Sequence, residues 1–250
     1  MAASMRTVTV IPTGMSMLTE PTPLCPPGQS LAQLRLMQLV SPGLPIGGFT
    51  YSQGLEFAVE AGWVGDVVSL QDWLLGQIED TITHLEVPVL VRLYHACVAR
   101  DVDAMTEWSS YLLATRETRE LRLEEQQRAR ALTRLLADLE MTEALHWSQA
   151  LQHCQAAPYA LAAVNWGIRL PEAALGYTWS WLENMVAAAI KLIPLGQTDG
   201  QRVLLALAEA LPEAVKHGLE LTDEQIGGSA PAMALASSLH ETQYTRLFRS

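Results

Sequence analysis

The chain has 250 residues, of which 49% are hydrophobic, and its formal net charge at pH 7 is −11. A chain of this length and composition can bury one substantial hydrophobic core. The net negative charge repels nucleic-acid phosphates and anionic lipid headgroups, so we expect neither nucleic acid nor a membrane as a partner. The three cysteines are Cys25, Cys97 and Cys154, and they form no CxxC motif. Their odd number and wide spacing predict a reducing, cytoplasmic location.

The N-terminal residues differ in composition from the remainder. Residues 1–29 contain five of the 13 prolines, which predicts a flexible arm ahead of a folded domain that spans residues 30–250. The most apolar later run, "MVAAAIKLIPLG", has only about a dozen residues and includes Lys191. It is too short to cross a bilayer, which needs roughly 20 apolar residues.

Helical spacing of apolar residues dominates from Ser30 onward. Ser30 can cap a first helix, which Ser41 and Pro42 then end. The next helix follows in "SQGLEFAVEAG" and ends near Gly62. Further helices are expected over residues 67–84, 87–100, 101–114, 116–138, 141–155, 158–169 and 171–190. In "QRVLLALAEALPEAVKHG", Pro212 must kink or divide the helix. The pattern predicts an all-α, single-domain bundle of about ten helices, with no strand outside "TVTVI" in the arm.

Common catalytic and metal motifs are absent. The glycine-rich stretch "GLPIGGFTYSQGLE", residues 43–56, lacks the GxxxxGK[ST] spacing of a phosphate-binding loop. His240 and Glu241 begin an HExxH motif, but Tyr244 occupies the position of the second histidine. The single ExxH pair, Glu143 with His146, cannot build a di-iron centre. No GxSxG nucleophile elbow occurs.

Two charged or aromatic stretches each permit two interpretations. In "RETRELRLEEQQRAR", residues 116–130, the four-residue spacing of Arg116 with Glu120 and of Glu124 with Arg128 fits either a solvated helix or a partner-docking face. The last residues, "HETQYTRLFRS", fit either a final helix that docks on its own core or a segment that anchors an interface.

Three stretches together resemble one family, that of the urease accessory protein UreF. They are "LMQLVSPGLPIGGFTYSQGLEFAVEAGWV" (36–64), "YLLATRETRELRLEEQQRA" (111–129) and "HETQYTRLFRS" (240–250), and "KLIPLGQ" (191–197) adds support. Their order and spacing cover nearly the whole expected domain. Only residues 1–29 lie outside the resemblance.

The resemblance implies a helical, non-enzymatic scaffold or chaperone that dimerises and binds the accessory protein UreD, also called UreH. That complex recruits the GTPase UreG and delivers nickel to apo-urease. In this family UreF modulates the GTPase and contributes part of a nickel passage. Nickel and GTP would then act through partner proteins, and this chain would bind no cofactor tightly.

The resemblance also implies which residues contact partners. The glycine-rich loop can turn tightly and approach another surface closely, and its prolines limit the entropy lost on ordering. The implied contacts are Phe49, Tyr51, Ser52, Gln53, Gly54 and Glu56 in and after this loop, and Tyr244, Arg246, Leu247 and Phe248 in the tail. Lys191 matches the lysine that precedes the family's Pro-x-Gly turn, and is expected to face the GTPase.

Two other functions remain open from the residues alone. A helical enzyme could use Lys191 or Glu56 together with a histidine in an apolar pocket. An autonomous nickel carrier could instead use imidazole or thiolate ligands. Its candidates are His84, His95, Cys97 and His153.

Overall fold

The computed structural model describes residues 27–250, so most of the expected arm and the "TVTVI" segment lie outside the described residues. Within residues 27–250 every regular element is a helix, which confirms the all-α prediction. The α-helices are α1 (Pro27–Leu39), α2 (Leu55–Glu60), α3 (Val67–Gln77), α4 (Val87–Ala99), α5 (Val102–Thr115), α6 (Arg119–Asp138), α7 (Thr142–His146), α8 (Ala156–Asn165), α9 (Leu170–Leu192), α10 (Gln197–Ala208), α11 (Leu211–Glu220) and α12 (Pro231–His240). All except α2 and α7 have at least ten residues, in agreement with the expected ten or so helices. None of these described helices combines the length and apolar character that crossing a bilayer requires.

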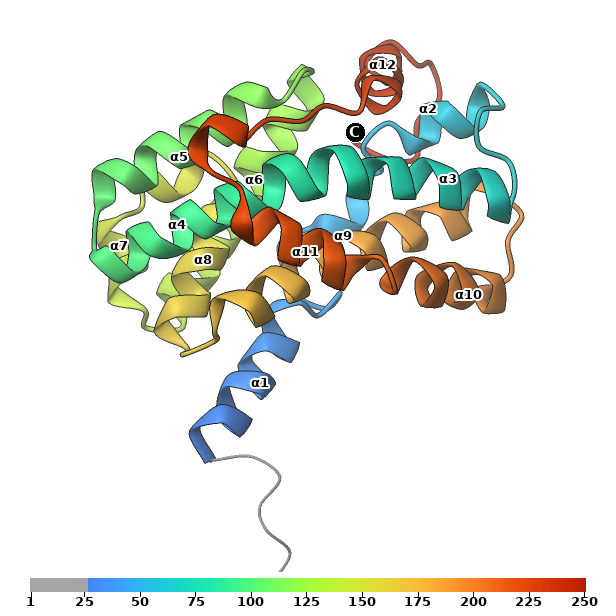
Figure 1. The fold of residues 1–250 in the computed structure, drawn as a ribbon. Coiled ribbons are helices and arrows are strands. Elements are labelled where there is room, and N and C mark those ends of the chain that lie inside the picture. The colour runs from blue at the N-terminus through green and yellow to red at the C-terminus, as the bar shows by residue number, and fades with distance from the viewer. Residues whose placement is uncertain (1–26) are drawn as a thin grey trace, which may run out of the picture.

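Helices α3 and α4 form one continuous rod, although two separate helices were expected here. A nine-residue π-helix, η2 (Ile78–Glu86), joins them, and the rod runs across the whole width of Figure 1. Pro88 follows the π-helix and has no N–H to donate to the carbonyl of His84 four residues earlier. That carbonyl accepts a hydrogen bond of 2.9 Å from the Gly227 N–H instead.

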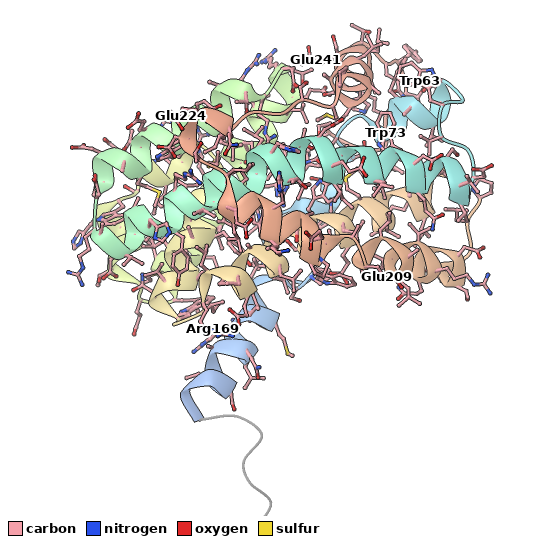
Figure 2. All side chains as sticks on the ribbon, in the orientation of Figure 1. Trp63, Trp73, Arg169, Glu209, Glu224 and Glu241 are labelled. Atoms are coloured by element: carbon pink, nitrogen blue, oxygen red, sulfur yellow. The ribbon has the colours of Figure 1, made fainter. Side chains whose placement is uncertain are left out.

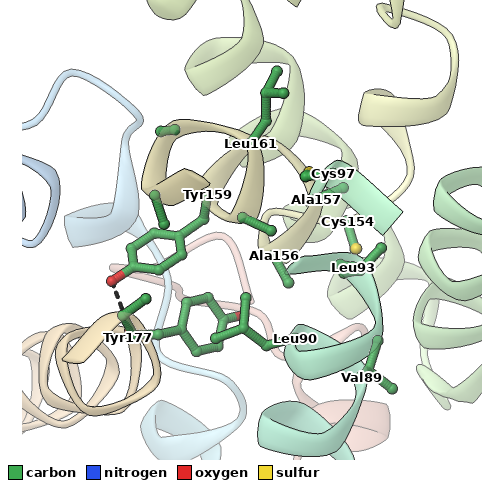
Figure 3. Packing of buried hydrophobic residues seen from close by; sticks show 14 of the residues in the cluster. Val89, Leu90, Leu93, Cys97, Cys154, Ala156, Ala157, Tyr159, Leu161 and Tyr177 are labelled. Atoms are coloured by element: carbon green, nitrogen blue, oxygen red, sulfur yellow. Dashed lines mark hydrogen bonds between the residues drawn. The ribbon is translucent and has the colours of Figure 1, made fainter. Parts of the chain in front are cut away.

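Helix α9 occupies the centre of the molecule and contacts α1, α2, α3, α4, α8, α10 and α11. On one side, α4 and α8 complete a core in which alanines allow close helix approach. There Tyr159 packs edge to face with Tyr177 and donates a 2.8 Å hydrogen bond to the carbonyl of Ala173 (Figure 3). A second core lies between α9 and the helices α2, α3 and α10. Side chains fill the space between the helices throughout (Figure 2).

Helix α1 projects from the body, and only part of it packs against α9 (Figure 1). It begins at Pro27, three residues before the expected start at Ser30. Leu31, Leu34 and Met37 are exposed to 56, 63 and 66% respectively. A bundle helix normally buries such residues, so this face of α1 is an unsatisfied apolar surface.

Two helical boundaries are set by proline and by packing. Pro212 divides the segment after residue 201, as expected, because it sits in the first turn of α11. The helix expected over residues 141–155 was wrong: only the short α7 and a 3₁₀ turn, η3 (Ala150–Gln152), form there. The carbonyl of Ala150 accepts a 3.0 Å hydrogen bond from the Ser109 hydroxyl of α5. This tertiary contact, together with the burial of Ala150, outweighs local helix propensity.

Helices α2 and α12 cross at a glycine. Gly54 caps α2 with a left-handed φ of 81°. A Cβ at this position would lie 2.7 Å from the backbone nitrogen of Ser237 in α12. Only glycine therefore satisfies both the backbone conformation and the close approach.

We predict that Gly54→Ala lowers the free energy of unfolding by about 3 kcal/mol, because the left-handed conformation and the clash with α12 add. Gly62→Ala is the matched control, since Gly62 has a φ of 74° and open space around it. The control should lose only about 1 kcal/mol. Guanidinium unfolding measures both, and equal losses would show that the α2–α12 contact is unimportant.

Candidate partner-docking site

The last residues of the chain do not form a helix but lie as an extended tail over α2 and α6. Glu56, in the first turn of α2, holds this tail through both carboxylate oxygens. Its Oε1 accepts a 2.5 Å hydrogen bond from the Leu247 N–H, and its Oε2 accepts one of 2.8 Å from the Phe248 N–H. The carboxylate thus satisfies two consecutive backbone donors, which are strong because the acceptor is charged. The Phe248 side chain is buried beneath the tail.

His240, at the end of α12, links the tail anchor to α6. Its Nε2 lies 3.2 Å from Oε2 of Glu56, and its Nδ1 lies 2.6 Å from Oε2 of Glu120. The imidazole is fully buried. The other oxygen of Glu120 accepts a 2.5 Å hydrogen bond from Arg246. One histidine therefore joins three segments that are far apart in the sequence.

The final residue, Ser250, is also enclosed. Its main-chain oxygen accepts hydrogen bonds from the N–H and the hydroxyl of Ser52, at 2.8 and 2.6 Å. Its own hydroxyl donates to Glu124 at 2.8 Å. Glu124 in turn forms a 2.9 Å ion pair with Arg128. The loop before α2 and the charged helix α6 therefore hold the two sides of the tail.

Below the tail lies a second charged cluster, which corrects one expectation. Arg116 does not pair with Glu120; it forms ion pairs with Glu86 and Glu125 in the protein interior. Burial alone would lower the pKa of Arg116, but the two carboxylates raise it well above its usual value. Burial likewise favours a higher pKa for Glu125, yet the charge of Arg116 lowers it. The Glu124–Arg128 pair forms as expected but is buried, so the solvated-helix interpretation of residues 116–130 was wrong for this inner face.

The pKa of Glu86 is raised by burial. Tyr177 of α9 donates a 3.2 Å hydrogen bond to it. These groups line a cavity of about 30 Å³, which has room for about one water molecule. The cluster therefore joins the π-helix, α6 and α9 through satisfied polar contacts rather than through an open pocket.

The outer side of the tail forms a groove with α6. The groove has a volume of about 450 Å³ and is lined by Tyr51, Glu120, Leu123, Gln127, Arg246, Leu247, Phe248 and Arg249. Leu247 is 65% exposed and Leu123 is 40% exposed, and Tyr244, three residues before Leu247 in the tail, is fully exposed. Aromatic and arginine side chains are enriched among interface anchors, and the tail presents both kinds beside the exposed Leu247.

The structure divides the expected partner contacts into two groups. The exposed group consists of Phe49, Lys191, Tyr244, Arg246 and Leu247. The buried group consists of Tyr51, Ser52, Gly54, Glu56 and Phe248. Gln53 is half-buried and falls between the two groups. The buried group positions the tail or packs beneath it. Lys191 lies close to this group, with its Nζ 5.4 Å from the centre of the Phe248 ring. Contact with a partner stays a prediction for all eleven residues.

Three anchoring residues were missed by sequence reasoning as parts of this site: Glu120, Glu124 and His240. Glu120 and Glu124 are four residues apart, so their side chains share one face of α6. That spacing was visible in the sequence. Their partners, however, come from the tail and from α12, and no local pattern indicates such distant contacts.

The residues that suggested an enzyme are already engaged. Glu56 does meet a histidine, His240, but both its oxygens accept hydrogen bonds from the tail. Lys191 is exposed and lies over an aromatic ring, outside an enclosed pocket. Neither side chain is placed as a free base beside an open substrate cavity.

The residues that suggested a nickel carrier are scattered. In the described part of the chain, no three His, Cys, Asp or Glu side chains gather closely enough to hold a metal ion. Burial raises the pKa of Cys97 to about 12, so its thiol stays protonated near neutral pH and is a poor ligand. Binding by the remaining candidates, His84, His95 and His153, stays untested.

Comparisons with known proteins identify the family. The UreF family model matches residues 64–208. The urease accessory protein UreF of Pseudomonas putida (strain W619) is 55% identical over 88% of this chain and 98% of its own length. Those of Alcanivorax borkumensis and Teredinibacter turnerae are 53% and 46% identical, over 88% and 87% of this chain and 98% of their own lengths. The chain belongs to the UreF family of urease accessory proteins. The resemblance seen in the sequence is thereby confirmed.

We predict that Glu56→Gln loosens the tail of this UreF family member. The amide retains one acceptor but replaces the other with a donor that faces a backbone N–H. Exchange of the Leu247 and Phe248 amide protons, measured by NMR, should become about tenfold faster. Glu107→Gln, at an exposed position of α5, is the control and should leave both rates unchanged. Unaltered exchange in Glu56→Gln would contradict the anchor.

Proposed function

We propose that this UreF family protein is a non-catalytic scaffold in urease maturation. It binds the accessory protein UreD, or UreH, and the resulting complex recruits the GTPase UreG and helps deliver nickel to apo-urease in the cytoplasm. The observation that carries this proposal is the ordered tail, which presents exposed anchors while its backbone is held from beneath by Glu56. The family membership supplies the urease context.

The tail and its groove are the surface we assign to UreD. Binding a disordered tail would require the partner to offset the entropy of ordering it. Here the hydrogen bonds to Glu56, Ser52 and Glu124 fix the tail in advance. The partner therefore meets Tyr244 and Leu247 on a rigid support, and more of the contact energy contributes to binding.

A scaffold role also agrees with the chemistry of the anchored groups. Carboxylates that serve as catalytic bases need a free oxygen within reach of a substrate. The oxygens of Glu56 accept tail amides instead. We therefore assign the binding of nickel and of nucleotide to partner proteins. We assign a contact that modulates UreG to the exposed Lys191.

We propose that two copies associate through the apolar face of α1 and α9. A shallow groove of about 380 Å³ lies there, lined by Leu36, Met37, Val40, Glu172, Leu175, Gly176, Trp179, Ala208, Leu211 and Pro212. Met37 and Leu175 are 66% and 39% exposed. Water-exposed apolar side chains that are contiguous on two helices favour a two-fold contact, because the same patch meets itself.

The assignment of UreD to the tail predicts that the double variant Tyr244→Ala with Leu247→Ala retains less than a tenth of the co-purified UreD. Truncation of central interface anchors typically weakens binding by about 1–2 kcal/mol each. The melting temperature should stay unchanged, because both side chains are exposed. The matched control combines Leu145→Ala with Val98→Ala, which are 62% and 59% exposed elsewhere. Full UreD retention by the tail variant would refute the assignment.

The proposed two-fold contact predicts that Met37→Glu weakens self-association at least tenfold, because two carboxylates would be buried near each other. Sedimentation equilibrium measures the dimer dissociation constant. Leu145→Glu introduces the same charge on α7, which is separated from α1 in Figure 1, and should leave the constant unchanged. Equal association of both variants would place the contact elsewhere.

A further inference from the structure

Two histidines from distant segments meet outside the docking site. His84 lies in the π-helix η2, and His217 lies in the last turn of α11. Their ring centres are 5.4 Å apart, and the ring planes are inclined at 69°. His84 is half-buried and His217 is exposed. Neither takes part in the tail, in its anchors or in the apolar face of α1.

The ring of His84 is fixed in one orientation. Its Nδ1 lies 2.7 Å from the carbonyl oxygen of Glu79, five residues earlier in the π-helix. A carbonyl oxygen can only accept, so Nδ1 carries the proton and donates. In the neutral ring, Nε2 then keeps its lone pair. Metal-binding histidines characteristically donate their other N–H to a carbonyl or carboxylate, which orients the ring and raises its basicity.

The backbone around His84 is held by two contacts. The His84 carbonyl, which Pro88 leaves without a helical partner, accepts the Gly227 N–H at 2.9 Å. Gly218, next to His217, lets α11 approach so closely that a Cβ there would lie 2.8 Å from the Thr83 carbonyl oxygen. The two imidazoles are thus carried by a π-helix and a helix, α11, whose close approach requires Gly218. Local π-helical turns often occur at functional sites.

We propose that His84 and His217 bind one divalent transition cation of the borderline class, such as Zn²⁺. With metal–nitrogen bonds of about 2.1 Å, two imidazoles on adjacent coordination positions have ring centres roughly 5 Å apart. The observed separation of 5.4 Å between the ring centres is close to this value. Imidazole ligands suit zinc, copper and nickel, and do not suit Mg²⁺ or Ca²⁺.

The groups around the two histidines indicate a site with two protein ligands and an exchangeable ion. Within residues 27–250 no third His, Cys, Asp or Glu completes a set of three ligands, so water fills the remaining positions and the ion exchanges readily. The one cation adjacent in sequence, Lys216, pairs with Glu213 at 3.3 Å. The net charge of −11 further raises the local concentration of cations.

The test uses the full chain without a tag, with ¹³C-labelled histidine, and Zn²⁺ as the probe. Of the six histidines, only the side-chain signals of His84 and His217 should shift, and they should shift together with one dissociation constant. The same ring separation also suits a simple edge-to-face contact. In that case neither signal would move at tenfold excess of Zn²⁺, and the proposal would be overturned.

Substitutions locate the ligands. His217→Ala replaces an exposed side chain and should leave the fold intact while weakening Zn²⁺ binding at least tenfold, as loss of one of two ligands requires. His153→Ala is the matched control, and should leave the affinity unchanged. Wild-type affinity in His217→Ala, or shifts that move to His153 or His95, would show that the cation binds elsewhere.

Discussion

The carboxylate of Glu56 fixes how α2, α12 and the C-terminal tail lie against one another. It accepts the backbone N–H groups of Leu247 and Phe248 and contacts His240, so α2, α12 and the tail meet at one buried charge. A buried carboxylate without partners would be strongly destabilising, whereas this one accepts two backbone N–H groups and contacts the His240 ring. Because the tail backbone is satisfied from beneath, its exposed side chains are free to contact a partner.

Buried charges are also paired with opposite charges in the interior of the protein. Arg116 pairs with Glu86 and Glu125, and Arg128 pairs with Glu124, which also receives the hydroxyl of Ser250. Helix α6 therefore has two charged layers on its inner side, one that holds the core helices and one that holds the tail. Substitution of one member would leave an unpaired buried charge, so these groups specify how α6 sits between the core and the tail. The surface that we propose for partner binding then depends on a rigid polar support rather than on the apolar core alone.

Much of the fold could be predicted from the sequence, because helical periodicity and proline positions are local signals. The division of the segment at Pro212 and the absence of strands in residues 27–250 are examples. The continuity of α3 with α4 was missed, since a π-helix leaves no hydrophobic period of its own that connects the expected helices over residues 67–84 and 87–100. The candidate site was predicted in its segments but not in its connections. The spacing of Glu120 and Glu124 was visible, whereas their partners His240, Arg246 and Ser250 arrive only through tertiary folding.

Three features of this UreF family member therefore stand out: a tail that is ordered before any partner binds, a glycine that allows α12 to contact α2, and an exposed apolar face on α1. Together they describe a protein that presents surfaces to other macromolecules, and the tail edge is the central one. A photo-reactive p-benzoylphenylalanine in place of Tyr244 tests this most directly, because that side chain is fully exposed and lies in the same tail as the groove residues Arg246 and Leu247. On irradiation of the assembled complex, the account predicts a covalent adduct with UreD, and none from the same group in place of Leu145. Cross-linking to UreD from position 145, or to another protein from position 244, would contradict it.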